Sequence, residues 1–165
     1  MERNVLTSGM SEISPIISEC VEKGMEVKFT IRGFSMYPLL YSLRDSVILV
    51  KADKYNLKKF DIPLYIRPDG SYVLHRIVKV NKEKGSYDIV GDAQKAIEKG
   101  VSAETVIAVV KGFDRKGKKF SEDNGLYRLY VRLWHILMPV RPYICRLLLK
   151  IDKLVKAFRK GASNG

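Results

Sequence analysis

Residues 33–40 read Gly-Phe-Ser-Met-Tyr-Pro-Leu-Leu, and the rest of the chain can be arranged around this stretch. Pro38 has no N–H and fixes its own φ, and it biases Tyr37 toward extended conformations. Gly33 permits a positive φ or a close approach of the backbone. The stretch is therefore a poor helix and a poor strand centre. It predicts a shaped turn after a strand, with the Ser35 hydroxyl presented to the surroundings.

A presented serine is a nucleophile only when a base reaches it. Residues 73–78 read Val-Leu-His-Arg-Ile-Val and contain His75, one of two histidines in the chain. A neutral imidazole, with an ordinary pKa of about 6.5, is suited to remove a hydroxyl proton at pH 7. A histidine within a β run can also be half-buried and hydrogen-bonded without catalytic work. Ser35 and His75 are therefore a candidate dyad.

Four segments together resemble a known family. In chain order they are residues 33–40, Arg44-Asp45-Ser46-Val47, Leu74-His75-Arg76-Ile77-Val78 and Val90-Gly91-Asp92-Ala93. They resemble four ordered boxes of the type I signal peptidase superfamily, which also includes self-cleaving repressors. A histidine at the position where bacterial housekeeping members carry lysine resembles the endoplasmic-reticulum, archaeal and sporulation-type branch. The likeness runs from about Val27 to Lys111.

The resemblance implies a serine endopeptidase with Ser35 as nucleophile and His75 as base, in a dyad or triad. The implied substrate is a signal or leader peptide of a precursor protein, bound as an extended strand in a shallow cleft. Neither a metal nor a cofactor is expected. The substrate-binding wall is expected to come from neighbours of the serine: Gly33, Phe34, Met36 and Pro38.

The orienting partner of His75 stays open at this point. Asp92 follows Gly91 in the box that resembles the Gly-Asp motif of the family, so it is the first candidate. The box continues Ala-Gln here, where the family pattern has Asn-Asn. Asp92 can equally be a turn-capping residue that pairs with Arg76. The weaker alternatives are Asp88 and Glu98.

Two charged residues of these segments are predicted to be structural. Arg76 stays protonated at neutral pH and cannot be the base, so we expect it to form an ion pair, for example with Asp92. Asp45 is expected to cap its turn by accepting backbone N–H bonds. An oxyanion hole would need the N–H of Ser35 and a second donor. Some relatives supply a serine hydroxyl at the position of Gly33, which has no side chain.

The hydrophobic pattern predicts a mainly β (α+β) fold of antiparallel strands joined by turns. An amphipathic helix is expected over residues 11–24, with Pro15 in its first turn. Pro63 indicates an edge strand or a strand start, and Arg-Pro-Asp-Gly-Ser at 67–71 indicates a turn. Strand alternation would place Arg76 on the sheet face opposite His75. The expected strands are 26–32, 46–51, 72–80, 86–90 and 103–112.

The charge of the chain is concentrated near its end. The 165 residues carry a net charge of +12, and residues 126–165 contain nine Lys and Arg with one acidic residue. Pro139 and Pro142 are predicted to split residues 126–158 into two helices. The expected organisation is a helical segment at 1–25, a catalytic β domain at 26–120 and a basic helical tail at 126–160.

The tail suggests a partner. Cationic amphipathic helices with Trp134 and several tyrosines suit an anionic membrane surface, so Leu126 to Phe158 is a candidate attachment segment. The alternatives are packing on the β domain and, less favoured, nucleic acid, which we do not expect to be a partner. His135 is expected to be interfacial. With no signal-peptide pattern and no long apolar run, a peripheral membrane or cytoplasmic location is expected.

Other function classes stay open. Cys20 and Cys145 show no metal-type spacing and no evident disulfide framework. A repressor-type self-cleaving regulator is opposed by the short segment before the first box and by the lack of an Ala-Gly pair in the sequence. An inactive, peptide-binding relative of the same fold would keep all the patterns described above.

Overall fold

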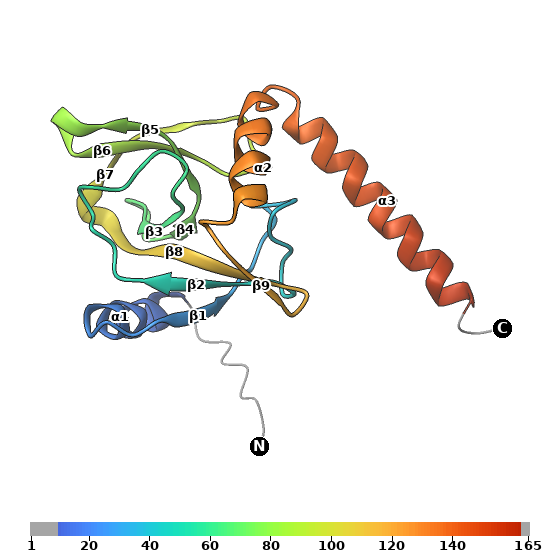
Figure 1. Cartoon of the computed structure of the whole chain (residues 1–165), viewed down its shortest axis with the longest axis horizontal. Helices are drawn as coiled ribbons and strands as arrows, with labels where there is room; N and C mark the ends of the chain where they lie inside the picture. The colour runs from blue at the N-terminus through green and yellow to red at the C-terminus, as the bar shows by residue number, and fades with distance from the viewer. Residues whose placement is uncertain (1–9, 163–165) are drawn as a thin grey trace, which may run out of the picture.

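The computed structural model describes residues 10–162, with side chains described for residues 13–155. It is mainly antiparallel β, with a short N-terminal helix and two C-terminal helices (Figure 1). The predicted mainly β, α+β class is therefore confirmed. Residues 1–9 of the predicted segment 1–25 lie outside the described part, as do the side chains of Lys156 and Phe158 in the predicted tail.

Short strands follow the N-terminal helix, and the two remaining helices come last in the chain. Two 3-10 turns, Lys82–Lys84 and Ala103–Thr105, precede the sixth and eighth strands. The helices and strands are α1 (Met10–Glu22), β1 (Val27–Thr30), β2 (Ser46–Val50), β3 (Pro63–Ile66), β4 (Tyr72–Leu74), β5 (Arg76–Asn81), β6 (Ser86–Val90), β7 (Glu98–Ser102), β8 (Val106–Arg115), β9 (Lys118–Ser121), α2 (Gly125–Ile136) and α3 (Arg141–Ala162).

Strand β8 is the spine of the larger sheet, whose order is β1-β2-β8-β3-β4, with β9 folded back onto β8. The register shifts between Ile48 and Leu49 in β2, and between Leu64 and Tyr65 in β3, where these strands pair with β8. Such irregularities bend strands and increase their twist, so the sheet curls into a half-barrel with β1 and β4 at its two edges. A second, smaller sheet has the order β5-β6-β7.

The single strand predicted over 72–80 is wrong. The predicted strand is interrupted at His75. Before it, β4 pairs with β3 in the larger sheet, and after it, β5 pairs with β6 in the smaller sheet. The predicted alternation of His75 and Arg76 across one sheet therefore does not apply. The strand predicted at 103–112 begins only at Val106, and β7 and β9 were not predicted.

Several local predictions are confirmed. Pro63 is the first residue of β3, which lies between β8 and β4, so its role is that of a strand start. The 67–71 turn is closed by the N–H of Arg67, which donates to the carbonyl of Ser71 at 2.9 Å. Asp45 accepts backbone N–H bonds from Tyr41 at 2.8 Å and from Lys116 at 3.3 Å, as expected for a cap.

The main core lies between α1 and the curled sheet. Ile17 and Val21 recur one helical turn apart on α1 and are buried in one hydrophobic cluster with Val47 of β2 and Val110 of β8, and α1 contacts both β8 and β1. Burial of one such side chain contributes roughly 1.5–3 kcal/mol. This packing holds β1, and therefore the turn that follows it, against the body of the protein.

The two helices predicted in the tail are present: α2 ends at Ile136 and α3 begins at Arg141, with Pro139 in the connection. Val131 and Trp134 of α2 are buried on the β body, so Trp134 does not face outward as expected of an interfacial tryptophan. Cys145, near the start of α3, is also buried. Beyond it, α3 projects away from the body (Figure 1).

Candidate active site

Ser35 lies on a turn shortly after β1, where the sequence predicted it. Gly33 has a φ of +91°, so of the two alternatives predicted for this glycine the positive φ is present, and its N–H donates to Oγ of Ser42 at 3.0 Å. The N–H of Tyr37 donates to the carbonyl of Phe34 at 3.1 Å and tightens the turn. Ser35 itself is half-buried and lines a cleft.

His75 stands at the crossing from one sheet to the other and lines the same cleft. The residue is only 3% exposed. Burial, followed by the positive charge of Arg67, lowers the pKa of His75 to about 4, and the charges of Glu98 and Asp92 oppose this effect. His75 is therefore uncharged at neutral pH and can accept a proton.

A close backbone approach at Gly91 brings the two residues together. A Cβ placed on Gly91 would lie 2.7 Å from the carbonyl oxygen of Ser35 and 3.0 Å from Nε2 of His75. The N–H of Ala93 also donates to the carbonyl of Ser35 at 2.8 Å. The loop after β6 is thus tied to the serine turn, and only glycine fits between that turn and the imidazole.

Asp92 is fully buried and forms a two-pronged ion pair with Arg76. Nε of Arg76 donates to one carboxylate oxygen at 2.8 Å, and Nη2 donates to the other at 2.7 Å. The expected Arg76–Asp92 ion pair is therefore present. Nη1 of Arg76 also donates to the carbonyl of Phe60 and to the hydroxyl of Tyr127. Because both oxygens of Asp92 are occupied by Arg76, this geometry favours a structural role for the pair.

The other two carboxylates considered from sequence differ in position. Glu98 accepts hydrogen bonds from Tyr65 and Arg67, and it lines a shallow hollow next to the cleft together with His75. Asp88 lies on the smaller sheet, where it accepts from Asn81 at 3.0 Å. Glu98 is therefore the carboxylate of these two that shares a hollow with the candidate base.

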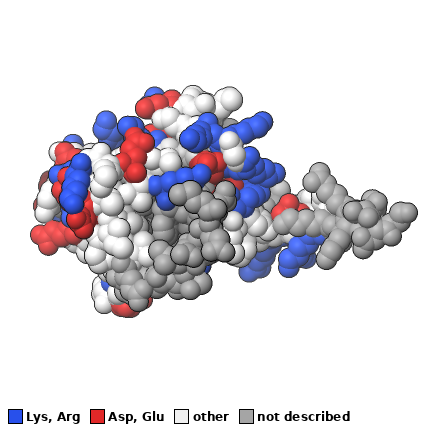
Figure 2. All heavy atoms as spheres, turned by 90° about the horizontal axis from the view of Figure 1, so that it is seen from below, with Lys and Arg blue, Asp and Glu red and all other residues white. Residues whose placement is uncertain are grey.

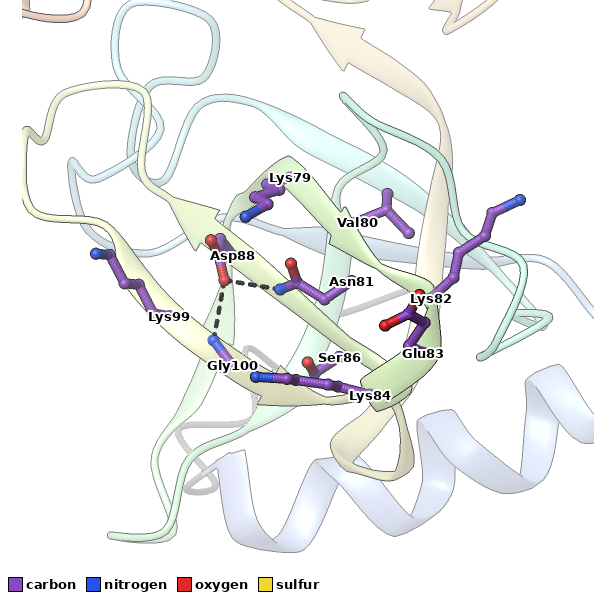
Figure 3. Close-up of a pocket in the computed structure, with 10 residues that line it drawn as sticks. All are labelled: Lys79, Val80, Asn81, Lys82, Glu83, Lys84, Ser86, Asp88, Lys99 and Gly100. Carbon is purple, nitrogen blue, oxygen red and sulfur yellow. Dashed lines mark hydrogen bonds between the residues drawn. The ribbon is translucent and has the colours of Figure 1, made fainter.

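Asp88 lines another hollow, which lies along β5, β6 and β7 and, at about 640 Å³, is larger than the cleft at Ser35 (Figure 3). Lysine side chains surround this hollow, among them Lys82, Lys84 and Lys99. No histidine lines it, and neither do Ser35 and Asp92; of the candidate residues considered from sequence, only Asp88 is among its lining residues. The smaller cleft at Ser35 combines a hydroxyl and an imidazole, and for that reason we assign the candidate site there.

The cleft has a volume of about 320 Å³ and lies between the two edges of the curled sheet. Phe29 of β1 lines one side, and residues 72–74 of β4 line the other. Edge strands present backbone N–H and C=O groups with which an extended peptide can pair. The cleft is thus bordered by two strand edges, with backbone hydrogen-bonding groups available to an extended chain.

Of the residues predicted to bind substrate, Met36 lines the cleft, whereas Gly33, Phe34 and Pro38 are not among its lining residues. The ring of Phe34 instead meets that of Tyr41 edge-on. Several other residues that were not predicted to bind substrate line the cleft, although the alternation of β1 and the box around Asp92 indicate some of them. These residues are Phe29, Ile31, Arg32, Leu64, Arg67, Tyr72 and Gln94.

Helices α2 and α3 contact the two loops that carry the candidate residues, through Trp134 and Cys145. The indole nitrogen of Trp134 donates to the carbonyl of Asp92 at 2.9 Å. The thiol of Cys145 lies 3.6 Å from the carbonyl of Tyr37, to which it can donate. His135 packs edge-on against Phe60 and takes no part in the cleft. The tail therefore contacts both loops that carry candidate residues.

Within residues 10–162, no cluster of three or more His, Cys, Asp or Glu side chains could hold a metal ion. No helix in this described range is long and apolar enough to cross a membrane. No family model, curated protein or solved structure matches the chain.

Proposed function

We propose that the chain is a serine endopeptidase in which Ser35 is the nucleophile and His75 is the general base. The observation that carries this proposal is the arrangement at Gly91, where the backbone of Ser35 and Nε2 of His75 lie around one point. The lowered pKa of His75 supports the role, because the base is uncharged at neutral pH.

In the proposed reaction, Oγ of Ser35 attacks the carbonyl carbon of the scissile bond while His75 takes its proton. The imidazolium returns the proton to the leaving amine, and an ester on Ser35 remains. A water molecule, deprotonated by His75, then attacks the ester. This step releases the new carboxyl terminus and restores the serine hydroxyl.

The negative oxygen of the tetrahedral intermediate needs two donors. The backbone N–H of Ser35 supplies the first in this proposal. The second is the side-chain amide of Gln94, which lines the cleft together with Ser35 and His75. Gln94 thereby takes the place of the hydroxyl that Gly33 cannot offer. Loss of one such donor lowers kcat by roughly 100- to 1000-fold.

The proposed substrate is a signal or leader peptide of a precursor protein. Two features support this class: the resemblance of the four segments to the type I signal peptidase superfamily, and the position of the cleft between edge strands β1 and β4. A peptide in extended conformation would pair with these edges and present its scissile carbonyl to Ser35. Arg76 and Asp92 act in this proposal as a buried support for the loop beside the base.

One observation favours a second candidate, a peptide-binding relative without activity. The carboxylate of Asp92 is engaged by Arg76 rather than by His75, so Asp92 does not orient the imidazole in this arrangement. Such a protein would bind extended peptides in the same cleft and leave them intact. Cleavage measurements separate the two candidates.

The test uses a fluorogenic peptide library that includes Ala-x-Ala sites, with wild type, Ser35→Ala and His75→Ala. Cleavage by wild type and its loss in both variants is the expected result. The matched controls are Ser18→Ala on α1 and His135→Ala on α2, which lie outside the cleft. If the wild type binds peptides but does not cleave them, the proposed peptidase activity is rejected and the second candidate, a peptide-binding protein without activity, is supported.

A further inference from the structure

Helix α3 exposes a continuous apolar stripe. Tyr143, Leu147, Ile151 and Leu154 follow at spacings of four, four and three residues, so they lie on one side of the helix. Leu147 and Leu154 are each 59% exposed, although burial is the usual state of leucine. Large apolar side chains in a row on a solvent-facing helix indicate that another phase or partner covers them.

Cations run alongside this stripe. Arg146, Lys150 and Lys153 are exposed, and each directly precedes a residue of the stripe in the sequence. Lys and Arg can lay their methylene groups on apolar surface while their charged ends stay in the polar layer. Figure 2 shows Lys and Arg side chains along the projecting arm of the molecule.

Asp152 is the only acidic residue among residues 141–155, and it does not belong to the apolar stripe. The pKa of Arg44 is raised first by its hydrogen bond to Asp45 and also by the charge of Asp152. Asp152 follows Ile151 directly and precedes Leu154 by two residues, so it lies on a different side of α3 from the apolar stripe. The exposed face combines apolar and positively charged groups without a described negative charge.

We propose that this face of α3 lies on the surface of a membrane that contains anionic lipids. The stripe would enter the boundary between headgroups and acyl chains, and the cations beside it would meet lipid phosphates. The positive net charge of the chain, +12, acts in the same direction. The helix would lie in the plane of the interface rather than cross the bilayer.

A second copy of the chain fits this face less well. Two α3 helices packed along their stripes would bring the rows of Arg146, Lys150 and Lys153 close to one another. Like charges at such an interface cost free energy, whereas an anionic lipid surface offers the complementary charge. The charge pattern thus selects lipid over self-association.

The apolar face extends toward the candidate site. Leu137 and Val140, between the helices, are exposed, and Leu133 and Ile136 continue the apolar surface on α2. Lys95 lies over the ring of Tyr143, with Nζ 4.9 Å from its centroid, and it also lines the hollow that contains His75. Attachment through α3 would therefore bring the cleft near the lipid surface.

The test is flotation of the full chain with vesicles of phosphatidylcholine, with and without phosphatidylglycerol. We expect binding to the anionic vesicles only, and weaker binding at high salt. Arg146→Gln/Lys150→Gln/Lys153→Gln should weaken the partition by on the order of a hundredfold, from the usual contribution of each cation. Leu147→Gln/Leu154→Gln should also weaken it, with helix content checked by circular dichroism.

The matched control is Lys82→Gln/Lys84→Gln/Lys99→Gln at the hollow of Figure 3, which removes the same charge from the opposite part of the molecule. This variant should bind like wild type, and equal losses in both triple variants would reject α3 as the binding face. Equal binding to neutral vesicles would reject the anionic partner. A dimer that Leu147→Gln/Leu154→Gln makes monomeric would assign the stripe to self-association.

Vesicle binding is independent of the proposed peptidase activity. Ser35→Ala lies in the cleft and leaves α3 unchanged, so this variant should bind vesicles like wild type. If the chain binds anionic vesicles but cleaves no peptide, only the proposed peptidase activity is rejected. If it cleaves peptides but does not bind vesicles, only the proposed membrane attachment is rejected.

Discussion

The indole N–H of Trp134 donates a hydrogen bond of 2.9 Å to the main-chain carbonyl of Asp92, so helix α2 contacts the loop that carries the candidate site. The same loop reaches the serine turn through the N–H of Ala93 and the carbonyl of Ser35. Helix, loop and turn therefore form one connected unit. A change in α2 should consequently affect the cleft, although α2 contributes no residue to its lining.

We predict that Trp134→Ala destabilises the protein by roughly 3–5 kcal/mol, the usual cost of removing a buried tryptophan. The variant loses contacts with Cys145 and leaves the carbonyl of Asp92 without its indole donor. Urea unfolding measures the change. Leu133→Ala is the control, because Leu133 neighbours Trp134 in sequence but is 53% exposed, and a change within about 0.5 kcal/mol is expected there. Similar losses in both variants would contradict the proposed packing.

The Arg76–Asp92 pair provides a second prediction. Asp92→Ala leaves the buried Arg76 without its counter-charge, and removal of one partner of such a pair costs about 3–5 kcal/mol. Replacement of both by apolar residues, Arg76→Met/Asp92→Leu, should restore most of the stability, since no buried charge is left alone. Chemical denaturation of the two variants and wild type tests this order.

The double variant also separates two roles of Asp92. If the pair acts only as a support, the refolded double variant should regain peptidase activity that Asp92→Ala has lost. If Asp92 orients His75, activity should stay absent although stability has returned. Measurement of kcat/KM beside the free energy of unfolding distinguishes these outcomes.

The sequence predicted local features of the site well. The turn at Ser35 and the positive φ of Gly33 follow from chemistry within a few residues, and so does the cap at Asp45. The sheet change at His75 could not be predicted, because it depends on which distant strand each half pairs with. β7 was missed because Glu-Lys-Gly-Val-Ser lacks the alternation of a strand and contains Gly100.

The orientation of α2 shows a different limit of sequence patterns. Apolar residues occur on two sides of this helix, one carrying Val131 and Trp134 and the other carrying Leu129 and Leu133. Either side could have packed on the sheet by its composition. The side with Trp134 is buried because it packs with Tyr37 and Cys145. Tyr37 lies far before α2 in the sequence, and Cys145 lies after it, so the sequence of α2 alone does not indicate this packing.

Gly91→Ala should strongly impair catalysis. The new methyl group would lie 2.7 Å from the backbone oxygen of Ser35, which is closer than atoms tolerate, so the turn or the loop must move. Overpacking of this kind costs typically 1–3 kcal/mol of stability. A displacement of about 1 Å in the reacting groups can lower the rate roughly hundredfold.

The control for this variant is Gly125→Ala at the start of α2, where a Cβ would meet nothing within 4 Å. Alanine is favoured over glycine in a helix, so stability should be unchanged or slightly raised. Steady-state kinetics and thermal unfolding of both variants provide the comparison. Full activity of Gly91→Ala would show that the close approach at Gly91 is not required.

The lowered pKa of His75, about 4, sets the expected dependence on pH. As base, His75 must be neutral, so the acidic limb of kcat/KM should fall near pH 4 rather than near the ordinary value of about 6.5. Between these two values the unfolded chain binds the proton and the folded chain does not. Stability should therefore decrease as the pH falls through this window and change little above it.

Urea unfolding from pH 7 to pH 4 should show a smaller decrease in the free energy of unfolding for His75→Gln than for wild type. His135→Gln is the matching variant that measures how much the other histidine contributes to this decrease. An acidic limb near pH 6.5 would contradict the buried, uncharged state of His75 on which the proposed base depends.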